Sequence, residues 1–258
     1  MKGFIIILFL SFLTTVFSEE SSFIIPIKRI PPNSAVSSAS IIKLIRKPPT
    51  KKKKYTGIPI NLKKFIKIHT QSPTFYYTAF EHTFNGKKTN KLLDRSGKLI
   101  SICKSDFYSF LKRQGSGILE DGRSVNIIKG ERFQLLPKNC LGITKTGYRV
   151  IPYHTLAVNP AEMPFGNVYF IPASRGIHLP DGTVHDGFWF AHDTGAAFSG
   201  PINHRIDLYV KNKIGQNYFE KKGIKSHYPL EVYQVDYKTR VKVYKKYRRF
   251  LINENKRR

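Results

Sequence analysis

The chain has 258 residues, of which 44 are Lys or Arg and 17 are Asp or Glu, so its formal net charge is +27. With 41% hydrophobic and 13% aromatic residues it is too apolar for a wholly disordered protein and long enough for one or two packed domains. Only one long apolar run is present, at the start, which excludes a multi-pass membrane protein. Its two cysteines are too few for a disulfide-built miniprotein or a four-cysteine zinc site.

The N-terminal apolar run extends from Phe4 to Phe17 and follows Lys2. It is shorter than the roughly 20 residues that a membrane span needs, and it predicts a signal peptide over residues 1–18. We therefore expect an exported protein of the periplasm, the cell wall or the extracellular space. An uncleaved anchor is the alternative, and it also places the rest of the chain outside the cytoplasm.

An exported chain permits a disulfide between Cys103 and Cys140. Two separate buried thiols are the alternative, because a free cysteine behaves as a small hydrophobic residue. The sequence leaves both open.

Positive charge is concentrated toward the two ends of the chain. Residues 21–80 contain 12 Lys or Arg and no acid, and residues 238–258 contain 10 Lys or Arg and one acid. The segment 81–236 holds 14 of the 17 acids. The pattern predicts two basic arms around a more balanced domain. Such arms attract polyanions, so we expect anionic envelope polymers as partners and no nucleic acid; the alternative is that the arms only keep the protein soluble.

Composition changes along the chain divide it into four parts. After the signal peptide, residues 19–70 are rich in Ser, Pro and Lys, which predicts a basic, partly disordered linker. In residues 71–215, short apolar or aromatic stretches alternate with turn residues, which predicts an all-β domain. Residues 216–258 form a basic C-terminal extension.

Two segments have a more specific local pattern. The stretch SDFYSFLKR, residues 105–113, predicts one helix with Ser105 as its N-cap. Within the C-terminal extension, residues 230–237 and 239–244 alternate in the manner of strands. They would extend the sheet or form a separate basic hairpin, and the sequence does not decide between these.

The densest polar segment is 178–207, with four His, four Asp and four Gly. One interpretation is a metal site, because His and Asp are metal-ligand types, although no spaced ligand motif is present. A second is a carboxylate active site. Asp193 and Asp207 each adjoin an apolar strand, where burial would raise the carboxyl pKa toward that of a general acid. The third is that these residues are ordinary turn formers.

The sequence resembles the three-aspartate (3D) domain family, which includes the barrel of membrane-bound lytic transglycosylase A. The segment AHDTGAAFSGPINHRIDLYV, residues 191–210, is similar to the family's main motif. Upstream, HTLAVNPAEMPFGNVYFIP (154–172) and GSGILEDGRSVNI (115–127) resemble further family segments, and HLPDGTVHDGFWFAHD (178–193) resembles the hairpin that leads to its second aspartate. The resemblance covers about residues 75–212.

The resemblance implies an all-β double-psi β-barrel with a groove for glycan. It also implies a bacterial cell-wall lyase, a lytic transglycosylase. Such an enzyme cleaves the β-1,4 bond between N-acetylmuramic acid and N-acetylglucosamine of peptidoglycan and leaves a 1,6-anhydro end. The family's catalytic acid and base falls on Asp207, and its supporting aspartate falls on Asp193. The family's first aspartate falls on Asn159, where an amide cannot carry a proton.

The remaining expectations concern the rest of the site and the partners. We expect no metal and no cofactor, a monomer, and peptidoglycan glycan strands as the substrate. A non-catalytic wall-binding barrel and a metal-dependent wall peptidase remain as alternatives. The expected substrate-binding residues are Asn159, Thr194, Gly195, Tyr77 and Arg205.

Overall fold

The computed structural model describes residues 57–254, which belong to the compact unit Thr56–Arg258. The predicted signal peptide (1–18) and the predicted linker up to residue 56 lie outside the described residues. Among residues 57–254, none of the helices has the length and apolar character needed to cross a membrane.

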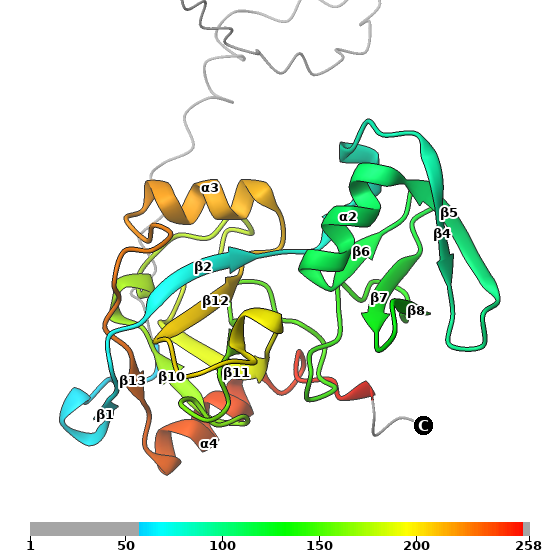
Figure 1. Cartoon of the computed structure of the whole chain (residues 1–258). Helices are drawn as coiled ribbons and strands as arrows, with labels where there is room; N and C mark the ends of the chain where they lie inside the picture. Colours follow the sequence, from blue (N-terminus) through cyan, green and yellow to red (C-terminus); the bar gives the residue numbers. More distant parts are fainter. Residues whose placement is uncertain (1–56, 255–258) are drawn as a thin grey trace, which may run out of the picture. The chain divides into compact units, whose positions relative to one another are not determined.

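A seven-stranded mixed sheet forms the main body of this unit (Figure 1). Its strands are, in spatial order, β1 (Ile66–Lys67), β13 (Tyr233–Gln234), β10 (Val168–Phe170), β11 (Phe188–Asp193), β9 (Thr155–Val158), β12 (Arg205–Tyr209) and β2 (Ser72–Tyr76). Strands from both sides of the predicted 71–215 domain contribute, because β1 precedes that range and β13 follows it.

The sheet has β1 and β2 at its two ends, and no strand pairing among the described residues joins these two edges directly. The structure supports the all-β expectation in part, because the fold is mostly β but also contains several helices. Short 3-10 helices interrupt the connections: η1 (Leu62–Lys64), η2 (Glu81–Thr83), η3 (Pro172–Ser174) and η4 (Ala196–Phe198).

The apolar run of strand β11 is buried on both faces of the sheet. Trp189 lies in a core cluster with Phe219 of helix α3 (Lys213–Lys221), and their ring centroids are 6.1 Å apart. Phe190 lies in a second cluster with Tyr247 of helix α4 (Tyr237–Tyr247), with centroids 5.5 Å apart. Because successive residues of a strand point to opposite faces, one helix covers each face and both faces are buried.

A second group of elements lies between β2 and β9 along the chain. The strands β3 (Ala79–Phe80), β6 (Ser116–Ile118), β7 (Ser124–Ile128) and β8 (Arg132–Leu135) form a four-stranded sheet, and β4 (Lys88–Leu93) and β5 (Leu99–Lys104) form a hairpin. This group has its own apolar cluster, which includes Phe107 and Leu111.

Helix α2 (Ser105–Gln114) confirms the one helix predicted within the β domain. Phe107 and Leu111 are four residues apart and form its buried stripe. The expected cap at Ser105 is wrong: Lys104 is the N-cap residue and makes no side-chain capping bond. The Asp106 carboxylate instead accepts the backbone N–H of Phe107 at 2.9 Å.

The strand-like alternation expected in residues 239–244 is also wrong, because this segment lies in helix α4. The Asp236 side chain accepts the Thr239 backbone N–H at 3.0 Å and caps the helix. Val243 and Tyr247, four residues apart, then pack on the sheet. The two cysteines, Cys103 and Cys140, are both free and buried, as in the alternative of separate thiols.

Candidate active site

A β-bulge determines which way Asp193 points. On the parallel pair β9–β11, Ala191 lies opposite Leu156, whereas Asp193 lies opposite Ala157, so β11 has one extra residue at His192. In a regular strand, Asp193 would share the core face of Ala191. The bulge turns it to the other face, on the side of Ala157.

Asp207 reaches the same place from the neighbouring strand. Its neighbours Ile206 and Leu208 lie in the core, so Asp207 points to the opposite face. It lies opposite Ala157 on β9 and opposite Thr74 on β2. Asp193, Ala157 and Asp207 therefore stand at one register on three adjacent strands. The small side chain of Ala157 leaves room between the two carboxyl groups, whose strands are about 10 Å apart at normal sheet spacing.

The two carboxyl groups have different hydrogen-bond environments. Asp193 accepts the backbone N–H of Lys145 at 2.9 Å and the hydroxyl of Tyr76 at 3.1 Å. Asp207 has one enclosed oxygen, Oδ1, without a hydrogen-bond partner, 3.8 Å from Nη2 of Arg205. The side chain of Asp207 is still 19% exposed, so its remaining atoms reach solvent. Asp193 is thus held in place, while Asp207 is available to a ligand.

Burial raises the pKa of both carboxyl groups to about 6. For Asp207, the charge of Asp193 raises the pKa further, while Arg205 acts in the opposite direction. For Asp193, burial is opposed by hydrogen bonds from Lys145, Thr194 and Tyr76. These bonds favour its ionised form. Burial, followed by the charge of Asp193, keeps the pKa of Tyr76 well above its usual range, so its hydroxyl remains a donor.

Both carboxyl groups line a cleft of about 830 Å³. Of the expected substrate-binding residues, Thr194 and Gly195 line it as well. Gly195 has φ −152°, an extended conformation that any residue adopts, and nothing lies within 4 Å of a Cβ added there. The structure therefore does not require a glycine at this position.

Arg205 is not among the residues that line the cleft. It is two residues from Asp207 on β12, and its Nη2 donates to the Thr74 hydroxyl at 3.2 Å. Its Nε is buried without a partner. Arg205 therefore influences the charge of Asp207 and holds β2 against β12.

Asn159 is 4% exposed and is not among the lining residues of the cleft. Its Oδ1 accepts the backbone N–H of Ala161 at 3.0 Å, and its Nδ2 donates to the carbonyl oxygen of Gly200 at 3.4 Å. Asn159 thus connects the end of β9 to the loop before Asp207. An aspartate there would have no N–H for the carbonyl of Gly200.

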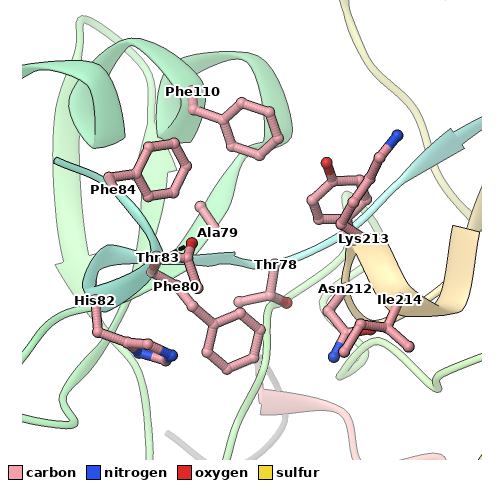
Figure 2. Close-up of a pocket in the computed structure, with 11 residues that line it drawn as sticks. Thr78, Ala79, Phe80, His82, Thr83, Phe84, Phe110, Asn212, Lys213 and Ile214 are labelled. Atoms are coloured by element: carbon pink, nitrogen blue, oxygen red, sulfur yellow. Dashed lines mark hydrogen bonds between the residues drawn. The ribbon is translucent and has the colours of Figure 1, made fainter. Parts of the chain in front are cut away.

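Tyr77 lines a different cavity, of about 430 Å³. Its ring centroid is 5.4 Å from that of Phe110. Figure 2 shows Phe84 and Phe110 on the α2 side of this cavity and Lys213 and Ile214 on the α3 side. The preceding residue, Tyr76, is the one that lines the cleft of the two carboxyl groups. The bond from the Tyr76 hydroxyl to Asp193 was not predicted from the sequence.

The histidines of segment 178–207 do not assemble around Asp207. His192 Nε2 bonds to the Tyr244 hydroxyl at 2.8 Å, and His204 Nδ1 to Glu162 at 2.6 Å. His185 instead belongs to a buried group with His154 and Asp186, the one cluster of metal-ligand type found among the described residues.

The side chains of His185 and Asp186 in this buried group are engaged in hydrogen bonds with other residues. His185 uses both ring nitrogens, with the carbonyl of Tyr153 and the N–H of Gly187. Asp186 binds Nζ of Lys246 at 2.6 Å and the hydroxyl of Tyr247 at 2.9 Å. The cluster connects helix α4 to the sheet. It could not be predicted from the sequence, because His154, Lys246 and Tyr247 are far along the chain from the adjacent pair His185 and Asp186.

Residues 154–230 match the 3D domain family. No curated protein matches the chain. Solved structures similar to the chain include the lytic transglycosylase LtgG of Burkholderia pseudomallei (13% identity, TM-score 0.36, 65% of this chain and 73% of that one). They also include Escherichia coli MltA with bound chitohexaose (13%, 0.41, 64% and 71%). A membrane-bound lytic murein transglycosylase from Agrobacterium tumefaciens is a third (15%, 0.38, 73% and 77%).

The matched range starts later and ends later than the resemblance seen in the sequence, which covered about residues 75–212. It includes β9, β11 and β12, and with them Ala157 and both carboxyl groups of the cleft. Residues 154–230 of this chain therefore form a 3D domain.

Proposed function

We propose that the chain is a peptidoglycan lytic transglycosylase that uses Asp207 as its single acid and base. The observation that carries this proposal is the register of Asp193, Ala157 and Asp207 within the 3D domain, with one carboxyl group anchored and the other open to a cleft. Two neighbouring carboxyl groups with raised pKa values are typical of acid–base sites on glycans.

The proposed reaction needs one proton carrier. Neutral Asp207 donates its proton to the glycosidic oxygen, and the bond from that oxygen to C1 of the muramic acid residue breaks. The 6-hydroxyl of the same sugar forms a new bond to C1 and returns its proton to Asp207. No water is consumed, and the product end is a 1,6-anhydro sugar. With a pKa of about 6, about one tenth of Asp207 is protonated at pH 7.

Asp193 would act through charge. The N–H of Lys145 and the hydroxyl of Tyr76 favour its ionised form, and that charge raises the pKa of Asp207. It would also stabilise the positive charge that develops on the sugar ring during cleavage. The replacement of a family aspartate by Asn159 is compatible with this scheme, because Asn159 is not on the cleft wall.

The proposal extends to a closed double-psi barrel. Residues 66–76 run from β1 at one edge of the sheet into β2 at the other. Gln71 bridges Leu230, and the His227 N–H donates to the carbonyl of Pro73 at 2.8 Å. These bonds support a path of closure through the segment 227–234.

The proposed substrate lies outside the cytoplasm, so the proposal includes export directed by residues 1–18. It also includes affinity of the basic arms for anionic envelope polymers. If removing residues 19–56 left sacculus binding unchanged at low salt, the N-terminal arm would have no such role.

The test is mass spectrometry of the soluble products released from purified sacculi. Wild type, Asp207→Asn, Asp181→Asn and wild type with a chelator are run in parallel. Asp181 is an exposed aspartate of the same domain that does not line the cleft, which makes it the matched control. We expect anhydro-ended muropeptides from wild type, the control variant and the chelated sample. The Asp207 variant should release at least about 100-fold less.

Other results would point elsewhere. Bound sacculi without any sugar-end product would favour a glycan-binding domain without catalysis. Release of peptides that a chelator abolishes would favour a metal-dependent peptidase. Full activity of Asp207→Asn would remove the proposed acid.

A further inference from the structure

The cleft that holds Asp193 and Asp207 is lined by five cations. They come from the β4–β5 turn, the end of α2, the β7–β8 turn and the loop before β9, and all of their side chains are exposed: Arg95, Lys112, Arg113, Lys129 and Lys145. Among the lining residues, Asp193 and Asp207 are the only acids.

Most of these cations lack an ion-pair partner. Lys112 binds Glu131 at 3.1 Å, whereas Arg95, Arg113, Lys129 and Lys145 make no ion pair with any residue in 57–254. Elsewhere in the unit, carboxylates do neutralise cations, as where Glu120 binds two lysines at 2.5 and 2.6 Å. Charges of one sign around a cleft add up to a field that concentrates ligands of the opposite sign.

Besides these cations and some uncharged polar side chains, such as Gln134 and Thr194, the cleft offers little aromatic surface to a sugar. Tyr76 is the single aromatic residue among its described lining residues. Its hydroxyl is committed to Asp193, and its ring lies 5.1 Å from that of Tyr209. Neutral glycans are commonly held by stacking on open aromatic faces, because those faces supply apolar area beside polar groups. Without an open aromatic face, positive charge is the feature of this cleft that would distinguish a charged glycan from a neutral one.

We propose that the cleft selects glycan strands that carry carboxylates, and that Arg95, Lys129 and Lys145 determine this specificity. The inference rests on the proposed function and names its substrate class. Lys145 links selection to chemistry, because its backbone N–H holds Asp193 while its exposed side chain lines the cleft. The carboxylates are supplied either by stem peptides or by the free lactyl groups of peptide-free strands.

The test measures dissociation constants at 50 and 300 mM salt for the full chain carrying Asp207→Asn, so that no probe is cleaved. The three probes are soluble peptide-bearing strands, the same strands freed of peptides by an amidase, and the neutral hexamer of N-acetylglucosamine. The test variant adds Arg95→Gln, Lys129→Gln and Lys145→Gln. The control variant instead adds the same change at three exposed lysines of α3 and α4: Lys221, Lys238 and Lys242.

We expect carboxylate-bearing strands to bind at least about tenfold more tightly than the neutral hexamer at 50 mM salt, and much of this gap to close at 300 mM. The test variant should lose about tenfold in affinity for those strands, and the control variant less than twofold. Thermal unfolding that matches the parent confirms that each variant folds.

If peptide-bearing and peptide-free strands both bind, the cleft recognises carboxylates of either source. If only peptide-bearing strands bind, the cleft recognises the carboxylates of the stem peptides. Equal affinity for the neutral hexamer, or equal losses in the test and control variants, overturns the inference while strand cleavage by wild type still upholds the proposed function. Absence of binding to all three probes overturns both.

Discussion

Replacement of Asp207 by asparagine is expected to stabilise the folded protein at pH 8 and to change its stability little at pH 4. Burial raises the pKa of this carboxyl group from 3.8 to about 6, so the folded state binds the proton more tightly than the unfolded state does. The wild type therefore loses stability as the pH rises from about 4 to about 6. The amide of asparagine has nearly the same shape and no charge to bury.

The size of the effect follows from the two pKa values. A rise from 3.8 to about 6 corresponds to about 3 kcal/mol of unfolding free energy at pH 8 and about 0.5 kcal/mol at pH 4. For a domain of this size, about 3 kcal/mol raises the melting temperature by about 6–12 °C. The gain is an upper value, because the side chain is 19% exposed and the carboxyl group is partly hydrated.

Urea unfolding at the two pH values measures the difference directly. The single tryptophan, Trp189, is fully buried and provides a fluorescence signal from the core. Asp94→Asn is the control of opposite sign. Hydrogen bonds, first from the Ser96 hydroxyl and then from backbone N–H groups, lower the pKa of Asp94, so its loss should destabilise the protein at pH 8. Equal gains for Asp207→Asn at pH 4 and pH 8 would refute the argument from burial.

Three further substitutions test the surroundings of the site. Tyr76→Phe removes a hydrogen bond that lowers the pKa of the anchored carboxyl group, so the acidic limb of the rate-against-pH profile for anhydro-product release should move to higher pH; an unchanged limb would contradict this. Asn159→Asp should not increase product release, because this side chain is off the cleft wall, and a severalfold gain would show otherwise. Lys246→Met should lower the urea-unfolding free energy by about 1–3 kcal/mol, because the fully buried Asp186 carboxylate loses its cation. Lys245→Met, one residue away and exposed, is its control and should change the free energy by less than about 0.5 kcal/mol.

Part of the site could be predicted because its physical cause is local. Asp193 and Asp207 stand beside apolar residues in the sequence, and burial raises the pKa of both carboxyl groups. Asp193 ends β11 as expected, whereas Asp207 lies in the middle of β12 rather than beside it. Helix α2 could also be predicted from the sequence, because Phe107 and Leu111 are four residues apart and form one buried face. The 3D-domain resemblance was confirmed because its motif is a continuous segment that carries both carboxyl groups.

The rest depends on pairings between distant segments. Whether Tyr76 or Tyr77 faces the carboxyl groups is set by the register of β2 against β12, which no local pattern encodes. The bulge at His192 is visible only once β9 lies beside β11. Helix α4 was not predicted because Val241 and Val243 alternate with polar residues as in a strand. The helical spacing of Val243 and Tyr247 forms a buried face only because both side chains pack on the sheet.

The burial of β11 on both faces has a consequence for the order in which the molecule is completed during synthesis. Phe188 and Phe190 emerge from the ribosome about fifty residues before the helix that covers them, α4, and β2 emerges more than a hundred residues before its partner β12. Chains that end before helix α4 would expose this aromatic face and lack the Lys246–Asp186 bond. The cleft needs residues up to Asp207, and the sheet beneath it is covered only when helix α4 follows, so fragments that end between these points are expected to be less stable than the full chain.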